Sequence, residues 1–226
     1  TWGTIMADVV FTNTNGLDAY ELSSDLSVLT DTTLTVSPGT IVMGQGGVEL
    51  YVVGHLDAVG DVQHPITFTS ASDSGPYQWS GLVFDRGTGD LRHVTVRYGG
   101  YTDSVFNNNL LGSNITVRNV LTGAVRIESS HVISEYNYYS NYHRTDYGLY
   151  VENSRVLIHD TLFADNGNDA NDTALYVIGD STKLTVTRSI FRHNPGTAIA
   201  VKTGQRRILR RQDRLAPGRR RAAGHR

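Results

Sequence analysis

The sequence predicts an all-β protein, a single-stranded right-handed parallel β-helix (β-solenoid) that occupies residues 1–204 and ends in an incomplete coil. Three observations predict this fold. The composition favours short strands and turns, an internal repeat runs through the chain, and each repeat contains segments with a two-residue alternation of apolar and polar side chains.

The composition describes a packed protein with many turns. Of the 226 residues, 39% are hydrophobic and 19% are charged, and the chain contains 23 glycines. A charged fraction below the usual quarter, together with abundant Thr, Ser and Asn, disfavours a helical protein and favours strands separated by turns. The chain has no cysteine, so disulfides and thiolate metal sites are excluded.

The repeat is clearest in two segments, residues 148–166 and 174–194, which both read as strand, Ser, strand, aromatic residue and closing Asn. Residues 123–141 repeat this order more loosely, and residues 81–100 and 113–120 are more divergent copies. The closing residues are Asn141, Asn166 and Asn194, and stacked amides at such turns can hydrogen-bond from coil to coil.

Alternation within a repeat explains why the repeats must stack. Leu149 and Val151 point to one side of their strand, and Tyr150 and Glu152 point to the other. A unit this short cannot bury its apolar side alone, whereas stacked units with parallel strands can. The absence of a helical crossover pattern argues against a Rossmann fold or an α/β barrel.

Five segments carry a resemblance to a known superfamily: residues 34–42, 54–60, 64–70, 79–84 and 94–100. With these segments the chain resembles secreted bacterial proteins of the pectin-lyase-like superfamily, over roughly residues 20–204. The resemblance implies a parallel β-helix and a location outside a bacterial cell or on its surface. It does not imply one activity, because that superfamily includes lyases, hydrolases, adhesins and proteins without known activity. No catalytic signature of pectate lyases or polygalacturonases is found in this sequence.

The two ends of the chain differ from the repeats. The chain opens at Thr1 without a signal peptide, so we interpret its start as processed or trimmed, and no apolar run reaches the ~18 residues of a membrane span. Residues 205–226 hold nine of the 20 basic residues, which leaves the rest of the chain with a net charge of −10. We interpret this tail as a disordered, out-of-frame or cloning-derived extension rather than a specific nucleic-acid arm. An incomplete last coil would expose strand edges, so we expect self-association through that end.

Outward side chains of stacked coils form rows, and two rows contain candidate catalytic groups. In the first, Glu128 and Glu152 are expected to be neighbours, as an acid/base pair, a cation site or two solvated carboxylates. Next to them, Tyr150 and Tyr176 are expected to form a flat platform that binds sugars or simply stabilises the strands.

The second row places Glu135 beside His159, as a carboxylate–imidazole pair that can act as a general base or bind a metal. This row predicts the ion pair Arg118–Glu135, and the residues next to it predict the ion pair Asp160–Arg188. The alternative is an exposed network of little energetic weight. A third row collects further polar and basic side chains: His93, Asn114, His131, Arg155 and Lys183. The residues considered for a divalent metal such as calcium or zinc are Glu128, Glu152, His159 and Asp160.

The segment 136–147 is the most unusual part of the chain, with five tyrosines among its twelve residues. We expect it to form either a ligand-binding loop beside the two rows or a long turn packed over the sheet. Its candidate substrate-binding residues are Tyr136, Tyr139, Tyr142, His143 and Arg144.

Three functions remain open from the sequence. The first is a secreted protein that binds or processes an extracellular polysaccharide. The second is a metal-assisted hydrolase of small esters or phosphoesters that uses surface histidines and carboxylates. The third is a non-catalytic adhesin or repeat domain. The sequence does not decide whether the protein is an enzyme.

Overall fold

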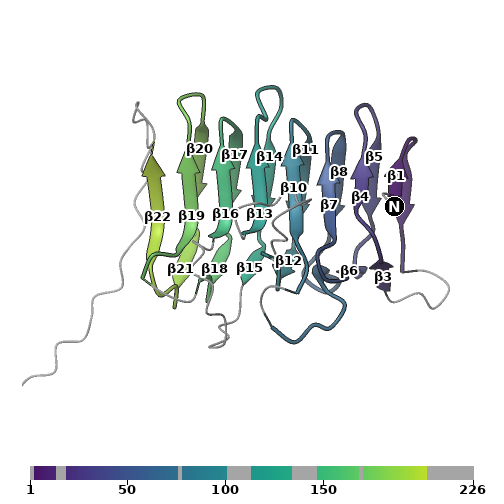
Figure 1. The fold of residues 1–226 in the computed structure, drawn as a ribbon, viewed down its shortest axis with the longest axis horizontal. Coiled ribbons are helices and arrows are strands. Elements are labelled where there is room, and N and C mark those ends of the chain that lie inside the picture. The colour runs from purple at the N-terminus through teal and green to yellow at the C-terminus, as the bar shows by residue number, and fades with distance from the viewer. Residues whose placement is uncertain are drawn as a thin grey trace, which may run out of the picture.

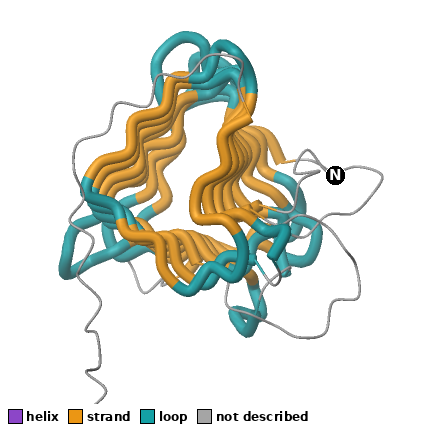
Figure 2. The backbone as a smooth tube through the Cα atoms, turned by 90° about the vertical axis from the view of Figure 1, so that its left-hand side faces the viewer, coloured by secondary structure: helices purple, strands orange, loops and turns teal. Residues whose placement is uncertain are grey.

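A computed structural model describes residues 3–13, 19–75, 78–100, 113–133, 147–167 and 170–202. In these residues the chain forms three parallel sheets of eight, seven and seven strands, and successive coils follow one another along a single axis (Figure 1). Viewed along that axis, the three sheets form the walls of a three-sided tube with loops at the corners (Figure 2). The predicted parallel β-helix is therefore confirmed. None of the described segments is a helix capable of crossing a membrane.

Each complete coil contributes one strand to each of three sheets, named A, B and C in chain order, and the last described strand, β22, belongs to sheet A. Sheet A contains β1 (Gly3–Ile5), β4 (Leu26–Val28), β7 (Glu49–Val52), β10 (Gly81–Asp85), β13 (Ser113–Arg118), β16 (Tyr147–Glu152), β19 (Thr173–Ile178) and β22 (Thr197–Lys202). Sheet B contains β2 (Val9–Phe11), β5 (Thr33–Val36), β8 (His55–Val59), β11 (Thr88–Arg92), β14 (Val125–Glu128), β17 (Arg155–His159) and β20 (Lys183–Thr187). Sheet C contains β3 (Ala19–Leu22), β6 (Ile41–Gly44), β9 (Ile66–Ser70), β12 (Val94–Arg97), β15 (His131–Ile133), β18 (Leu162–Ala164) and β21 (Ile190–Arg192).

The stack of coils begins at β1, earlier than the part of the sequence that carries the superfamily resemblance, because β1 pairs in parallel with β4 and β2 with β5. At the other end, β22 adds an eighth strand to sheet A. The basic tail 205–226 lies outside the described residues.

The inside of the tube is filled by aligned apolar side chains. One inward column of sheet A consists of Leu26, Leu50, Leu82, Ile115, Leu149, Leu175 and Ile199. All but the first and last of these are fully buried. Because burying one such side chain contributes ~1.5–3 kcal/mol, these columns are the main stabilisation of the fold.

Tight corners fix where each strand ends. Asn119 and Asn153 follow strands of sheet A with positive φ angles of 58° and 44°. The backbone N–H of Asn119 donates to the carbonyl of Glu152 in the next coil, at 3.0 Å. The Ser154 hydroxyl then donates to the same carbonyl at 2.6 Å and accepts from the N–H of Val120 at 3.0 Å. The last residue of each sheet A strand is therefore held in register with its neighbours.

The corner from sheet C to sheet A carries the predicted asparagine stack. The Asn166 side chain is buried and donates to the amide oxygen of Asn194 at 3.2 Å and to the carbonyl of Val132 at 3.0 Å. The Asn166–Asn194 contact is confirmed, whereas Asn141 lies outside the described residues.

Candidate functional site

The two acidic candidates Glu128 and Glu152 are not neighbours, which corrects the first predicted row. Glu128 ends β14 in sheet B, whereas Glu152 ends β16 in sheet A, where it aligns with Arg118 of β13. The prediction was wrong because it aligned Val125–Glu128 with the first strands of other coils. The first strand of that coil is β13, which the prediction left out of the row.

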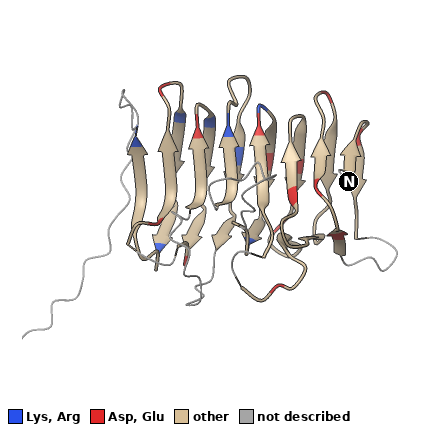
Figure 3. Ribbon diagram, in the orientation of Figure 1, with Lys and Arg blue, Asp and Glu red and all other residues tan. Residues whose placement is uncertain are grey.

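The C-terminal ends of the sheet A strands carry a row of mostly charged side chains in register. This row, named the charged strip, contains Asp85, Arg118, Glu152, Ile178 and Lys202. Charged residues of both signs are visible at the ends of these strands in Figure 3. Successive members lie ~4.8 Å apart along the helix axis, the spacing of neighbouring strands.

Asp85 is a largely enclosed acid of the strip, with 14% of its side chain exposed. Its carboxylate lies 3.3 Å from the Nε of Arg118, and it accepts hydrogen bonds from Tyr51 Oη at 3.0 Å and Asn119 Nδ2 at 3.2 Å. Burial, and secondarily the negative charge of Asp85, raises the pKa of Tyr51, so this phenol remains a donor. The three groups hold Asp85 in a fixed orientation.

Glu152 has different surroundings, although it belongs to the same strip. Its Oε2 accepts a hydrogen bond from Tyr150 Oη at 3.2 Å. Burial, followed by the charge of Glu152, raises the pKa of Tyr150 well above its ordinary range. Among the residues that the structure describes, Glu152 forms no ion pair, so much of its accepting capacity remains open to a ligand.

The predicted contact between Tyr150 and Tyr176 is confirmed, but not as a flat platform. Their ring centroids are 5.6 Å apart with an interplanar angle of 10°, so the rings stack on each other. Tyr147 packs against both rings at 5.7 Å and 4.6 Å. Because Tyr147 and Tyr150 are buried, Tyr176 is the member of this cluster with the most accessible side chain, and Lys202 Nζ lies 5.4 Å from its centroid.

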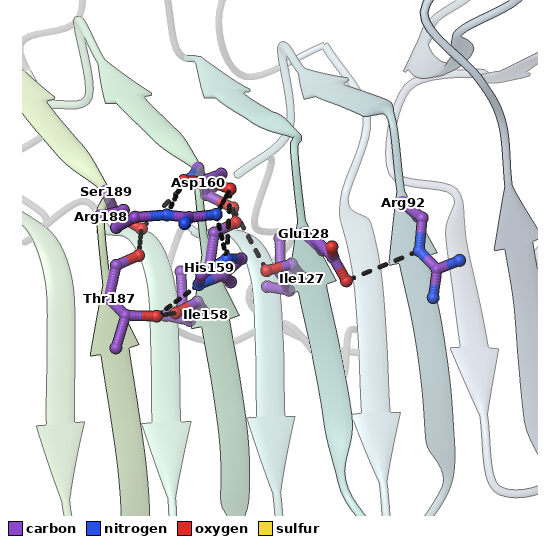
Figure 4. Close-up of polar contacts among 10 residues, drawn as sticks. Arg92, Ile127, Glu128, Ile158, His159, Asp160, Thr187, Arg188 and Ser189 are labelled. Atoms are coloured by element: carbon purple, nitrogen blue, oxygen red, sulfur yellow. Dashed lines mark hydrogen bonds and ion pairs between the residues drawn. The ribbon is translucent and has the colours of Figure 1, made fainter.

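His159 belongs to a second cluster, on the outer face of sheet B (Figure 4). It aligns with Glu128 of the preceding coil, and Glu128 in turn lies 3.6 Å from Arg92. The Nδ1 of His159 is 2.5 Å from the hydroxyl of Thr187. Arg188 forms charge-assisted contacts with Asp160, and a hydrogen bond from Arg188 lowers the pKa of that carboxyl group. The predicted Asp160–Arg188 ion pair is confirmed.

The hydrogen bonds of His159 determine what it can do in this arrangement. A guanidinium group only donates, so the contact of 2.6 Å from Arg188 Nη2 makes Nε2 of His159 an acceptor. Nε2 also lies 3.2 Å from Asp160 Oδ2, and Nδ1 lies within hydrogen-bonding distance of the Thr187 hydroxyl. Both ring nitrogens are engaged, and this geometry offers neither a metal ligand nor a free general base.

A divalent metal does not fit the proposed residues as they are placed. Glu152 lies on another sheet, Glu128 faces Arg92, and Asp160 is occupied by Arg188. The described part of the chain contains no group of three or more His, Asp or Glu side chains arranged to hold a metal.

Several sequence candidates cannot be placed. Glu135, and with it the Arg118–Glu135 pair, lies outside the described residues, as do Tyr136, Tyr139, Tyr142, His143 and Arg144. The third predicted row is divided among the sheets: His131 aligns with Thr95 and Leu162 in sheet C, whereas Arg155 and Lys183 align in sheet B.

Sequence reasoning did not find the grouping of Tyr51, Asp85 and Arg118. Arg86, Asn119 and Asn153 each follow a member of the charged strip with a positive φ, but residues with positive φ also follow strands of sheet B, among them Ser129 and Asp160. The sequence therefore contains no signal specific to these strand ends. Comparison of the chain with protein families, curated proteins and solved structures found no match.

Proposed function

We propose that this chain is a secreted bacterial β-helix of the pectin-lyase-like kind that binds an extracellular polysaccharide along the outer face of sheet A. The observation that carries the proposal is the charged strip. It places hydrogen-bonding groups of both signs in one line parallel to the helix axis, at the spacing of the coils.

A linear polysaccharide has the chemistry that this line can recognise. It offers hydroxyl groups at regular intervals, and each hydroxyl can both donate and accept a hydrogen bond. Arg118 is a donor and Glu152 is an acceptor, and the Tyr147–Tyr150–Tyr176 cluster supplies apolar surface beside them.

Rigidity supports a binding role for this face. Asp85 is held by three side chains, and the strand ends are held by the corner hydrogen bonds. A pre-organised surface loses little conformational entropy when a ligand binds, so modest contacts give measurable affinity. The metal-hydrolase interpretation has weaker support, because the groups it requires are engaged with arginines on sheet B.

Affinity electrophoresis against a panel of neutral and acidic polysaccharides tests this proposal. We expect Glu152→Gln to weaken binding of the best ligand tenfold or more, about 1.4 kcal/mol, because the carboxylate acceptor is lost. Glu128→Gln is the matched control, since it makes the same change on sheet B, and it should bind like the wild type.

Equal affinity of wild type and Glu152→Gln, or an equal loss in Glu128→Gln, would contradict the proposed location. A reducing-end assay on the same mixtures distinguishes a binding protein from one that cleaves its ligand.

A further inference from the structure

A small cavity lies at the corner between sheets A and B, separate from the charged strip. Its volume is about 300 Å³. It is lined by Val120, Leu121, Gly123, Arg155, Ser181 and Lys183. These residues come from the turns after β13 and β19 and from the first positions of β17 and β20.

Two cationic residues line this cavity. Arg155 and Lys183 are directly aligned in the parallel pair β17–β20, so their backbones are ~4.8 Å apart. Like charges in directly opposite positions destabilise a sheet. Within the residues described, neither side chain forms an ion pair with an acid that would offset this repulsion.

Hydrogen bonds fix the backbone that carries both cationic residues. The N–H of Arg155 donates to the carbonyl of Val120 at 3.1 Å, and the N–H of Lys183 donates to the carbonyl of Ser154 at 2.9 Å. Leu121 is 71% exposed and forms an apolar wall of the cavity. The two cationic residues are thus attached to fixed backbone, and Ser181 lines the same cavity.

We propose that this cavity binds an oxyanion, a phosphate or sulfate group, between Arg155 and Lys183. A guanidinium group matches two oxygens of such an anion, and an ammonium group adds a compact positive charge. The Ser181 hydroxyl can donate to a third oxygen. The anion converts a repulsive pair into two attractive ones. The site does not depend on the polysaccharide proposal, since it uses other residues.

Isothermal titration with inorganic phosphate and, separately, inorganic sulfate tests the site at constant ionic strength set with sodium chloride. We expect saturable binding that weakens tenfold or more in Arg155→Gln and in Lys183→Gln. The tighter of the two anions identifies the chemical source of the group. Arg192→Gln is the control, because Arg192 is an exposed cation on sheet C and should not affect binding.

Thermal unfolding supplies a second readout that does not depend on affinity. Without phosphate, Lys183→Gln should be at least as stable as the wild type, since the repulsion is relieved. With phosphate, the wild type should gain more stability than the variant. Absence of binding by both anions, or equal affinity in all three variants, would overturn the proposal.

Discussion

The outer faces of sheets A and B share one apolar core and the same stacking geometry, yet their charged groups have different surroundings. On sheet A, Asp85 and Arg118 form an ion pair with 14% and 22% of their side chains exposed. On sheet B, Glu128 and Arg92 are each 46% exposed. Stacking places side chains in line on both faces, but shelter from water decides how strongly an aligned pair interacts.

The difference in exposure predicts that substitution by alanine lowers the free energy of unfolding by different amounts on the two sheets. Asp85→Ala should lower the free energy of unfolding by about 1–3 kcal/mol, because Tyr51 and Arg118 lose a sheltered acceptor. Glu128→Ala should change it by no more than about 0.5 kcal/mol, as is usual for exposed positions. Urea unfolding of the two variants measures both values.

Since both substitutions place alanine at the outer face of a strand, differences in strand propensity largely cancel between them. An equal loss in free energy of unfolding in the two variants would mean that burial of the ion pair does not make it more stabilising on sheet A than on sheet B.

The strands and their alternation could be predicted from the sequence, because an apolar–polar pattern needs only local residues. Local pairs near clear repeats were also predicted correctly, among them Tyr150–Tyr176 and Asp160–Arg188. These pairs lie in coils whose sequences align without ambiguity.

Assignment of strands to sheets could not be predicted in the same way. One local pattern, a residue with positive φ followed by Ser or Thr, occurs at corners after both sheets. Ser129 precedes Ser130 after sheet B, and Asn153 precedes Ser154 after sheet A. Val125–Glu128 therefore resembles Leu149–Glu152 in sequence although it lies in another sheet. Only the long-range pairing of β13 with β16 resolves the ambiguity.

The stability of the protein at alkaline pH tests the surroundings of Tyr150 on sheet A. The folded pKa of Tyr150 lies above its ordinary value of 10.0, so its contribution to stability is complete below that pH and is lost as the pH rises through the folded pKa. We expect the free energy of unfolding to fall between about pH 9 and about pH 11, and to fall less steeply in Tyr150→Phe. Urea unfolding across this range checks the slopes, and identical slopes would contradict the assignment.

The smallest of the expected effects concerns the titration of the Asp160 carboxyl group on sheet B. The folded pKa of Asp160 lies below its ordinary value of 3.8, mainly because Arg188 donates a hydrogen bond to it. Its stabilising contribution is present above that value and is lost as the pH falls through the folded pKa. In Arg188→Gln the Asp160 carboxyl should titrate closer to its ordinary value, which carbon-detected NMR can follow. An unchanged Asp160 titration would show that Arg188 is not its partner in solution.

The central claim is that polysaccharide binding belongs to the outer face of sheet A and not to that of sheet B. Backbone NMR during titration with a fragment of the best-binding polysaccharide tests it most directly. We predict the largest chemical-shift changes at Arg118, Glu152 and Ile178, with Glu128 and His159 unchanged. The largest changes at Glu128 and His159, with the charged strip unaffected, would contradict the claim.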